Sequence, residues 1–277
     1  MPTQFDLTAA LALTERIAKQ AGRLIMDIYK RPASAKGITM KGPIDVVTEA
    51  DTQSEKLIAD ALLAAYPEHH IIGEESGGMG APRQSADYLW HVDPVDGTTN
   101  FARGIPAFAV SIGLSDANNV PLLGVVYDPL HDECFVGYRG GGAKLGRKKL
   151  RVSKVRKLAD ALLASGFPTD RRVNPDNNTE EWSAFVTRSQ SVRRFGSAAI
   201  ELAYVACGRI DGFWEPRLKT WDCMAGMLLV EEAGGRVSDY RNRTDNAYNG
   251  LQVVASNGRI HEQMLEVIIL GHAAPRA

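Results

Sequence analysis

Apolar residues recur at helical spacing in two stretches near the start of the chain. The first stretch covers residues 7–30, and the second covers about 48–66 and is stopped by Pro67. Strand-like apolar runs follow, separated by turn-forming residues, at Phe108–Leu114, Leu122–Tyr127 and Glu133–Tyr138. This part of the pattern predicts two amphipathic helices followed by an antiparallel meander.

Short strand-like and helical patterns alternate from about residue 158 onward. In chain order they predict a strand at 161–164, helices at 179–190 and 197–207, a strand at 211–214, a helix at 222–233, strands near 236 and 252, and a helix at 259–269. Two further apolar runs, Ile71–Gly73 and Tyr88–Val92, predict strands in the first half. Without any internal repeat, the pattern predicts a mixed α/β (α+β) fold in two halves, residues 1–157 and 158–277.

Composition and charge are those of an ordinary globular protein. Of the 277 residues 44% are hydrophobic, which is enough for a sizeable core, and the formal net charge of −1 favours neither nucleic acid nor a membrane surface. The three cysteines, an odd and widely spaced set, indicate free thiols in a reducing compartment. The chain shows no signal-peptide pattern and no apolar run near the ~20 residues that span a bilayer. We therefore expect a cytoplasmic protein.

The segment from Asp93 to Asn100 reads Asp-Pro-Val-Asp-Gly-Thr-Thr-Asn. Two carboxylates three residues apart can point into one small space, and the glycine and threonines that follow offer backbone N–H groups to an anion. A surface turn with helix N-caps has the same composition, because Asp, Gly and Thr all favour such places. The segment therefore predicts a metal-binding pair beside a phosphate-binding turn, with a surface turn as the alternative.

Four more acidic residues lie at the ends of predicted elements. Glu74 and Glu75 follow the run Ile71–Gly73, Asp51 lies near the start of the second helix, and Asp222 is placed as the N-cap of the helix at 222–233. Each also has an ordinary explanation. Glu74 and Glu75 can be solvated glutamates, Asp51 an acid that is favoured in a first helical turn, and Asp222 a capping carboxylate. Together they favour a divalent-cation site. Oxygen ligands without a Cys or His cluster suit Mg²⁺, with Mn²⁺ as a substitute.

Several motifs occur in the order and spacing of one known family. They are Gly73–Ser76, Asp93–Phe101, Ala164–Pro168, Arg193–Ala199, Asp211–Phe213, and Trp221–Gly226 with Glu231 to Gly235 following. In these motifs the chain resembles the inositol monophosphatase family of Mg²⁺-dependent, lithium-sensitive phosphatases, especially its bacterial SuhB-type branch. The resemblance implies a layered αβαβα sandwich of the sugar-phosphatase type, two or three Mg²⁺ ions per site between the halves, and a homodimer.

The same resemblance implies a role for each matching residue. Metal ions would be held by the backbone carbonyl of Val95 and by the carboxylates of Glu74, Asp93, Asp96 and Asp222. The Thr98 hydroxyl, with Glu74 or Asp51, would orient the attacking water. Glu75, together with Lys41 on a loop, would support the metal ligands. The substrate would be bound by Val95, Asp96, Gly97, Thr98, Arg193, Gly196, Ala198, Glu215 and Asp222.

The implied reaction is hydrolysis of inositol-1-phosphate or a related polyol or sugar phosphate by direct attack of a metal-activated water. The chain lacks a Gly-x-Ser-x-Gly elbow, so a covalent serine intermediate is not expected. The alternatives within the superfamily are a fructose-1,6-bisphosphatase, a histidinol-phosphatase and a nucleotide 3′-phosphatase. A further alternative is a regulatory protein that binds RNA or a transcription complex and has incidental activity, as the bacterial branch is associated with ribosomal-RNA transcription.

Two glycine-rich or basic segments have less specific patterns. Gly141–Arg147 resembles a P-loop but lacks the required lysine and hydroxyl residue, which favours a glycine-rich turn between strands. Lys144–Lys157 contains eight basic residues and no aromatic residue for base stacking. Such a run is typical of a solvated surface, and contact with RNA or an acidic protein is the alternative.

One segment departs from the family pattern. Glu215-Pro216-Arg217-Leu218-Lys219-Thr220 stands where the bacterial branch has Glu-x-Gly-Leu-x-Pro, so a glycine is lost and the proline moves. Pro216 fixes φ, and Arg217 adds a charge beside Glu215. The reaction is expected to be retained, while the choice among inositol, sugar and other phosphates stays open.

Overall fold

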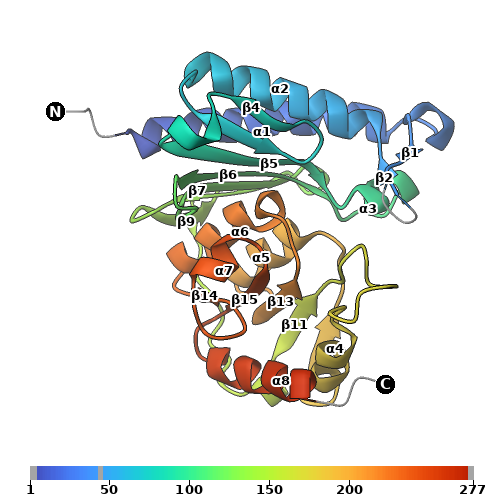
Figure 1. Ribbon diagram of the computed structural model, residues 1–277, viewed down its shortest axis with the longest axis vertical. Coiled ribbons are helices and arrows are strands. Elements are labelled where there is room, and N and C mark those ends of the chain that lie inside the picture. Colours follow the sequence, from blue (N-terminus) through green and yellow to red (C-terminus); the bar gives the residue numbers. More distant parts are fainter. Residues whose placement is uncertain (1–4, 43–45, 274–277) are drawn as a thin grey trace.

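Two long helices and a large sheet are formed by the first part of the chain. The computed structural model describes residues 5–42 and 46–273. Helices α1 (Leu7–Tyr29) and α2 (Glu49–Ala65) pack against each other and cover one face of this sheet (Figure 1). In the described residues the sheet has eight strands in the order β10-β9-β8-β7-β6-β5-β3-β4. Their bounds are β3 (His70–Gly73), β4 (Gly77–Gly80), β5 (Tyr88–Asp96), β6 (Ala109–Asp116), β7 (Pro121–Asp128), β8 (Glu133–Tyr138), β9 (Gly142–Leu145) and β10 (Lys148–Lys149).

A second, smaller sheet is formed by the later part of the chain. Its order in the described residues is β12-β11-β13-β15-β14, and β11 is parallel to both of its neighbours. Helices α5 (Ala198–Ala206) and α6 (Thr220–Glu232) lie between the two sheets, and α4 (Thr179–Val186) and α8 (His261–Ala273) pair on the outer side (Figure 1). The strands are β11 (Leu162–Ser165), β12 (Ser191–Arg193), β13 (Gly212–Pro216), β14 (Arg236–Ser238) and β15 (Gln252–Ser256). The layers are therefore α/β/α/β/α, which confirms the expected fold.

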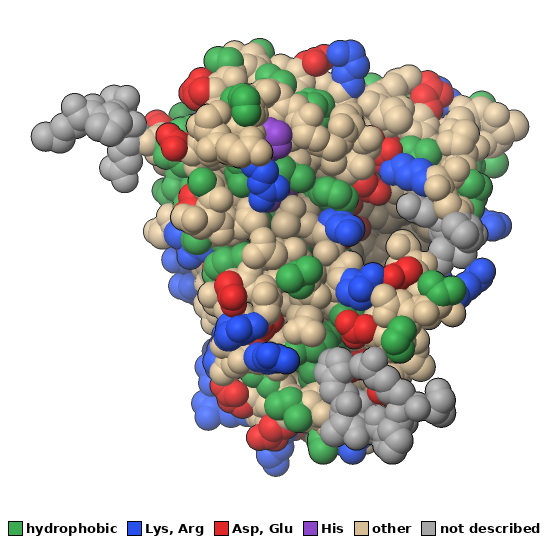
Figure 2. Space-filling view, viewed as in Figure 1, with side chains coloured by type: hydrophobic (Ala, Val, Ile, Leu, Met, Phe, Trp, Pro, Cys, Tyr) green, Lys and Arg blue, Asp and Glu red, His purple; other side chains and the backbone are tan. Residues whose placement is uncertain are grey.

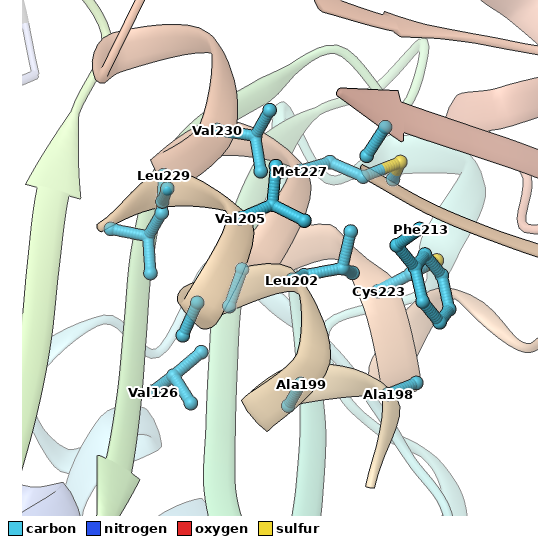
Figure 3. Close-up of a cluster of buried hydrophobic side chains, with 14 of the residues drawn as sticks. Val126, Ala198, Ala199, Leu202, Val205, Phe213, Cys223, Met227, Leu229 and Val230 are labelled. Carbon is cyan, nitrogen blue, oxygen red and sulfur yellow. The ribbon is translucent and has the colours of Figure 1, made fainter. Parts of the chain in front are cut away.

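Helix α6 joins the two halves through one hydrophobic core. It packs on β5–β8 of the large sheet and on β14 and β15 of the small one. Figure 3 shows Leu202 and Val205 of α5 beside Met227 and Val230 of α6, with Val126 of the large sheet nearby. Close approach depends on glycine: a Cβ at Gly124 of β7 would lie 2.4 Å from the Ala225 carbonyl oxygen of α6. The two halves thus share a core, and a boundary at residues 157/158 stays a prediction.

The main elements agree with the sequence pattern, including the meander β6–β7–β8, and two details differ. The helix expected at 179–190 ends at Val186, because the chain turns there to bring Ser191–Arg193 into the small sheet as β12. Gly141–Arg147 is not only a turn, since most of it forms strand β9 and the turn to β10. None of the described helices combines the length and apolar composition that crossing a bilayer requires.

Candidate active site

Strand β5 carries the first two acidic residues into the interior. Its apolar residues bury it inside the large sheet, between β3, to which it is parallel, and β6, to which it is antiparallel. The register with β6 shifts between Asp93 and Asp96, and a β-bulge of this kind re-aims side chains. Both carboxylates are buried, and Asp93 Oδ1 accepts a 2.9 Å hydrogen bond from the Val95 N–H. The alternative of a surface turn is therefore wrong for this segment.

A glycine in left-handed conformation links β5 to the short helix α3 (Thr98–Arg103). Gly97 has φ of 98°, and a Cβ there would lie 2.9 Å from the Ala107 carbonyl oxygen, so both conformation and space require glycine. The first backbone N–H groups of a helix have no partner within it. The first N–H groups of α3 therefore lack partners within the helix, and anion binding at this turn stays a prediction.

Asp51 combines a capping role with a contact to the site. It is fully buried in the first turn of α2, where its Oδ2 accepts a 2.8 Å hydrogen bond from the Thr48 N–H in a capping box. Its Oδ1 lies 3.0 Å from the Thr98 hydroxyl, which is also 3.0 Å from the Val95 carbonyl. Burial raises the pKa of Asp51. One oxygen of Asp51 therefore caps α2, and the other accepts a hydrogen bond from Thr98, while its role in the reaction stays a prediction.

Glu74 and Glu75 form the turn between β3 and β4. The turn is organised by Glu55, a buried residue of α2 whose carboxylate accepts hydrogen bonds from the N–H groups of Glu75 (2.8 Å) and Ser76 (2.7 Å). The Lys41 ammonium lies 3.5 Å from Glu74 and closer to Glu75. Burial raises the pKa of Glu74 to about 7, although Lys41 opposes the shift. Both glutamates are thus held in place, and neither is an ordinary solvated residue.

The opposite wall of the site comes from the second half of the chain. Asp222 occupies the third position of α6, where it accepts a 2.8 Å hydrogen bond from the Lys219 N–H. The expectation that Asp222 is the N-cap is wrong, because the helix starts two residues earlier and Lys219 takes that position. Glu215 is buried in β13, and a Cβ at Gly166 would collide with its carboxylate. Burial raises the pKa of Asp222 and of Glu215 well above the usual range.

Hydrogen bonds connect the two walls directly. Asp96 Oδ2 accepts 2.6 Å bonds from the Ser197 hydroxyl and the Ala199 N–H of α5, and burial raises the pKa of Asp96 to about 6. His91 of β5 lies 2.8 Å from the Thr220 hydroxyl at the start of α6. The walls are therefore held in register by contacts that span more than a hundred residues of sequence.

All four predicted carboxylate ligands line one cavity of about 390 Å³. In Figure 2 a recess is visible on the right between the upper and lower parts of the molecule, with acidic and basic side chains around it. The cavity is lined by Lys41, Glu74, Asp93, Val95, Asp96, Gly97, Thr98, Gly166, Phe167, Pro168, Thr169, Arg194, Gly196, Ser197, Ala198, Glu201, Glu215, Arg217, Leu218, Lys219, Trp221 and Asp222. Asp51 and Glu75 lie behind this lining and reach it through Thr98 and Lys41.

Two features of the lining differ from the sequence-based expectation. Arg193 is not part of the lining, because its guanidinium turns to the Ser191 hydroxyl and the Val192 carbonyl, and Arg194 lies at the cavity instead. Glu201 of α5 is buried and accepts hydrogen bonds from the N–H groups of Phe195 (2.7 Å) and Gly196 (3.2 Å). Burial raises the pKa of Glu201 to about 8. The only sequence signal for Glu201 is an acid within an otherwise apolar helix.

The donor set fits a hard divalent cation by chemistry. Carboxylates and the Val95 carbonyl supply oxygen only, and no Cys or His is among the lining residues that the structure describes. In the described residues no three acidic, histidine or cysteine side chains are gathered closely enough to hold one ion as they stand. The carboxylates instead accept protein hydrogen bonds, as Asp96 does from Ser197 and Asp222 from Lys219. Binding an ion would require some of them to turn into the cavity.

Comparison with known proteins agrees with this geometry. A model of the inositol monophosphatase family matches residues 6–269. The Nus factor SuhB of Pseudomonas aeruginosa is 42% identical over 260 residues, which cover 93% of this chain and 95% of that protein. An inositol-1-monophosphatase from Synechocystis is 39% identical over 264 residues, or 95% of this chain and 90% of its own length.

Solved structures show the same fold. An inositol monophosphatase from Anabaena (Nostoc) superimposes with a TM-score of 0.85 at 39% identity, covering 96% of this chain and 97% of that one. The extragenic suppressor protein suhB from Bartonella henselae gives a TM-score of 0.87 at 37% identity, covering 94% and 98%. The five-layer fold and its acidic cavity define an α/β phosphatase. More specifically, this chain belongs to the inositol monophosphatase family, whose members are hydrolases that generally depend on metal ions.

Proposed function

We propose that the chain is a Mg²⁺-dependent phosphatase that hydrolyses inositol-1-phosphate or a related polyol or sugar phosphate. One observation carries the proposal: four carboxylates from three separate segments converge beside the turn at Gly97, namely those of Glu74, Asp93, Asp96 and Asp222. Relatives that are inositol-1-monophosphatases support the substrate class. The oxygen-only donor set supports Mg²⁺, two or three ions per site, with Mn²⁺ as a substitute.

The same carboxylates, with the Val95 carbonyl, would hold the ions. When bound, the ions would neutralise the phosphate, lower the pKa of a water and stabilise the departing alkoxide. The N–H groups of Gly97 and Thr98 would bind the phosphate oxygens at the turn. The Thr98 hydroxyl, held by Asp51, would orient the attacking water in line with the leaving group, with Glu74 beside it.

The leaving group would lie against the second wall. Asp222 and Glu215 offer carboxylates, and Gly196 and Ala198 offer backbone groups near the start of α5. Arg194 would take the substrate-binding role that the sequence suggested for Arg193. Glu75 and Lys41 would keep the Glu74 turn in position, because the Lys41 ammonium pairs with both glutamates of that turn.

A substrate panel tests this proposal directly. Purified protein with Mg²⁺ should release phosphate from inositol-1-phosphate more efficiently than from fructose-1,6-bisphosphate, histidinol phosphate or adenosine 3′,5′-bisphosphate, and Li⁺ should inhibit it. A clear preference for one of the other three would replace inositol-1-phosphate as the substrate. Activity that persists after exhaustive chelation would refute the metal-dependent mechanism.

A homodimer and a cytoplasmic location are expected from the family and from the cysteine content. The cysteines in the described chain are free, with Cys134 and Cys223 buried. Sedimentation of the purified protein would measure the oligomeric state. A single species of 30.1 kDa would contradict the dimer.

A regulatory role is the second candidate, because a specific surface favours it. All eight basic residues between Lys144 and Lys157 are exposed, and relatives include proteins named Nus factor SuhB. The segment would contact RNA phosphates or an acidic partner without base stacking. RNA binding measured at increasing salt, with Lys148→Glu and Lys149→Glu combined, tests it. Unchanged binding in the double variant would exclude this surface as the contact.

A further inference from the structure

The loop after β13 adopts a backbone conformation that suits glycine but contains arginine. Arg217 has φ of 63°, in the left-handed region, which residues other than glycine rarely adopt. Its N–H donates a 2.8 Å hydrogen bond to the Leu251 carbonyl, so the loop conformation is fixed by the backbone. The arginine side chain is therefore held at the cavity mouth although its conformation disfavours it, which points to a use for the side chain.

Charge in this cavity is arranged in two levels. On the second wall the acidic lining residues Glu201 and Glu215 are buried and Asp222 is half-buried, whereas the cations Arg194, Arg217 and Lys219 are exposed. Among the described residues neither Arg194 nor Lys219 forms an ion pair, and Arg194 lies over the Phe167 ring at 5.2 Å. The outer end of a substrate whose phosphate enters the interior would thus lie near these exposed cations.

Arg217 is paired with an acid that lies outside the lining. Its guanidinium contacts Asp170 of the neighbouring loop at 166–170, and the two side chains are 43% and 37% exposed. An exposed pair of this kind is weak, so a ligand anion can compete for the guanidinium. Asp170 also accepts a 3.0 Å hydrogen bond from the Asn174 amide, so this carboxylate keeps a partner when Arg217 leaves.

We propose that Arg217 and Lys219 form a second anion subsite at the mouth of the cavity, which raises kcat/KM for a phosphate monoester whose leaving group carries a second phosphate or a carboxylate, relative to the matching ester without that anion. This inference rests on the proposed phosphatase function and names a feature of its substrate. In this scheme Asp170 holds Arg217 in the free enzyme and releases it to the bound anion. A simpler role for the cations is to balance the buried acids, and that role would affect all substrates alike.

Matched substrate pairs separate these two roles. Fructose 1,6-bisphosphate carries one phosphate more than fructose 1-phosphate. Likewise, 2-phosphoglycerate carries a carboxylate that glycerol 2-phosphate lacks. Arg217→Gly, which suits the backbone, and Lys219→Gln should each reduce the ratio of kcat/KM between the charged and neutral members about tenfold, through KM. Asp170→Asn should raise that ratio two- to threefold by freeing Arg217, on the scale of a weak exposed pair. The substrate pair whose kcat/KM ratio changes more in these variants shows whether the subsite prefers a phosphate or a carboxylate.

Arg172→Gln is the matched control, because Arg172 is exposed nearby and is not part of the lining. Arg217→Lys should restore part of the ratio that Arg217→Gly loses. An equal loss on all four substrates, or an unchanged ratio in Arg217→Gly and Lys219→Gln, would overturn the subsite. Should no substrate be hydrolysed, the proposed function fails separately, and calorimetric binding of the same four compounds still decides whether the second anion is recognised.

Discussion

The two walls of the cavity are built in different ways. The first wall, from β3, β5 and α3, consists of carboxylates and backbone N–H groups fixed by the large sheet and by buried hydrogen bonds to Glu55 and Asp51. The second wall, from the loops at 166–170, 194–198 and 215–219, ends in exposed cations. Groups that carry out chemistry need a rigid frame, whereas loops can change without loss of the fold. We therefore expect the first wall to set turnover and the second wall to set selectivity.

The largest effect is expected from Asp93 on the first wall. Asp93→Asn removes a negative charge from the cavity, and kcat should fall about 10³-fold or more on every substrate. This is the usual loss when a main electrostatic stabiliser of the transition state is removed. The steady-state rate of phosphate release measures it. Asp87→Asn, an exposed acid directly before β5, is the control and should behave like the wild type. A selective loss on one substrate only would place Asp93 with the second wall.

Thr98 should come next. Thr98→Val removes the hydroxyl that lies 3.0 Å from Asp51, and kcat should fall about 10²-fold with little change in KM, because the water is no longer oriented. The neighbouring Thr99→Val changes an exposed hydroxyl outside the acidic cavity and provides the comparison. Equal effects in the two variants would show that the loss comes from the turn and not from the hydroxyl.

The first wall should also make stability depend on pH and metal. Burial raises the pKa of Glu74 to about 7 and that of Asp96 to about 6, so the folded protein binds more protons than the unfolded chain over this range. Stability of the metal-free protein should therefore fall as pH rises from about 5 to about 7.5. Mg²⁺ should raise the melting temperature most at the upper end, because it binds the deprotonated carboxylates.

Thermal melts with and without chelator at several pH values measure this dependence. Glu74→Gln should flatten the slope of the metal-free protein, since the neutral amide has no proton to lose. A metal-free stability that rises over the same pH range would contradict the raised pKa values.

The smallest effect is expected on the second wall. Arg194→Gln should raise KM for a phosphate monoester about three- to tenfold with kcat nearly unchanged, on the scale of a charged hydrogen bond. Arg193→Gln should leave both constants unchanged, because that side chain turns to Ser191 and Val192. The two arginines are adjacent in sequence, so the pair of variants compares position alone. The reverse result would restore the role that the sequence suggested for Arg193.

Much of the first wall could be predicted from local pattern. The apolar run Tyr88–Val92, the acids of the following turn and the glycine at 97 each reflect a local requirement for burial, charge or backbone conformation. Glu55 was missed because its role is to bind N–H groups twenty residues away, and nothing near it in sequence indicates that contact. Arg194 was missed because the direction of a side chain at a strand end depends on its neighbours.

The sequence by itself determined the elements, the kinds of ligand atom and the family. Periodicity sets helices and strands, and residue type sets which chemistry is available. Only the tertiary structure decided which carboxylates share a cavity, that Asp222 stands inside the first turn of its helix, and that Arg217 pairs with Asp170. These facts depend on packing between residues far apart in the chain. Burial, which shifts their pKa values, exists only once both sheets have closed around α5 and α6.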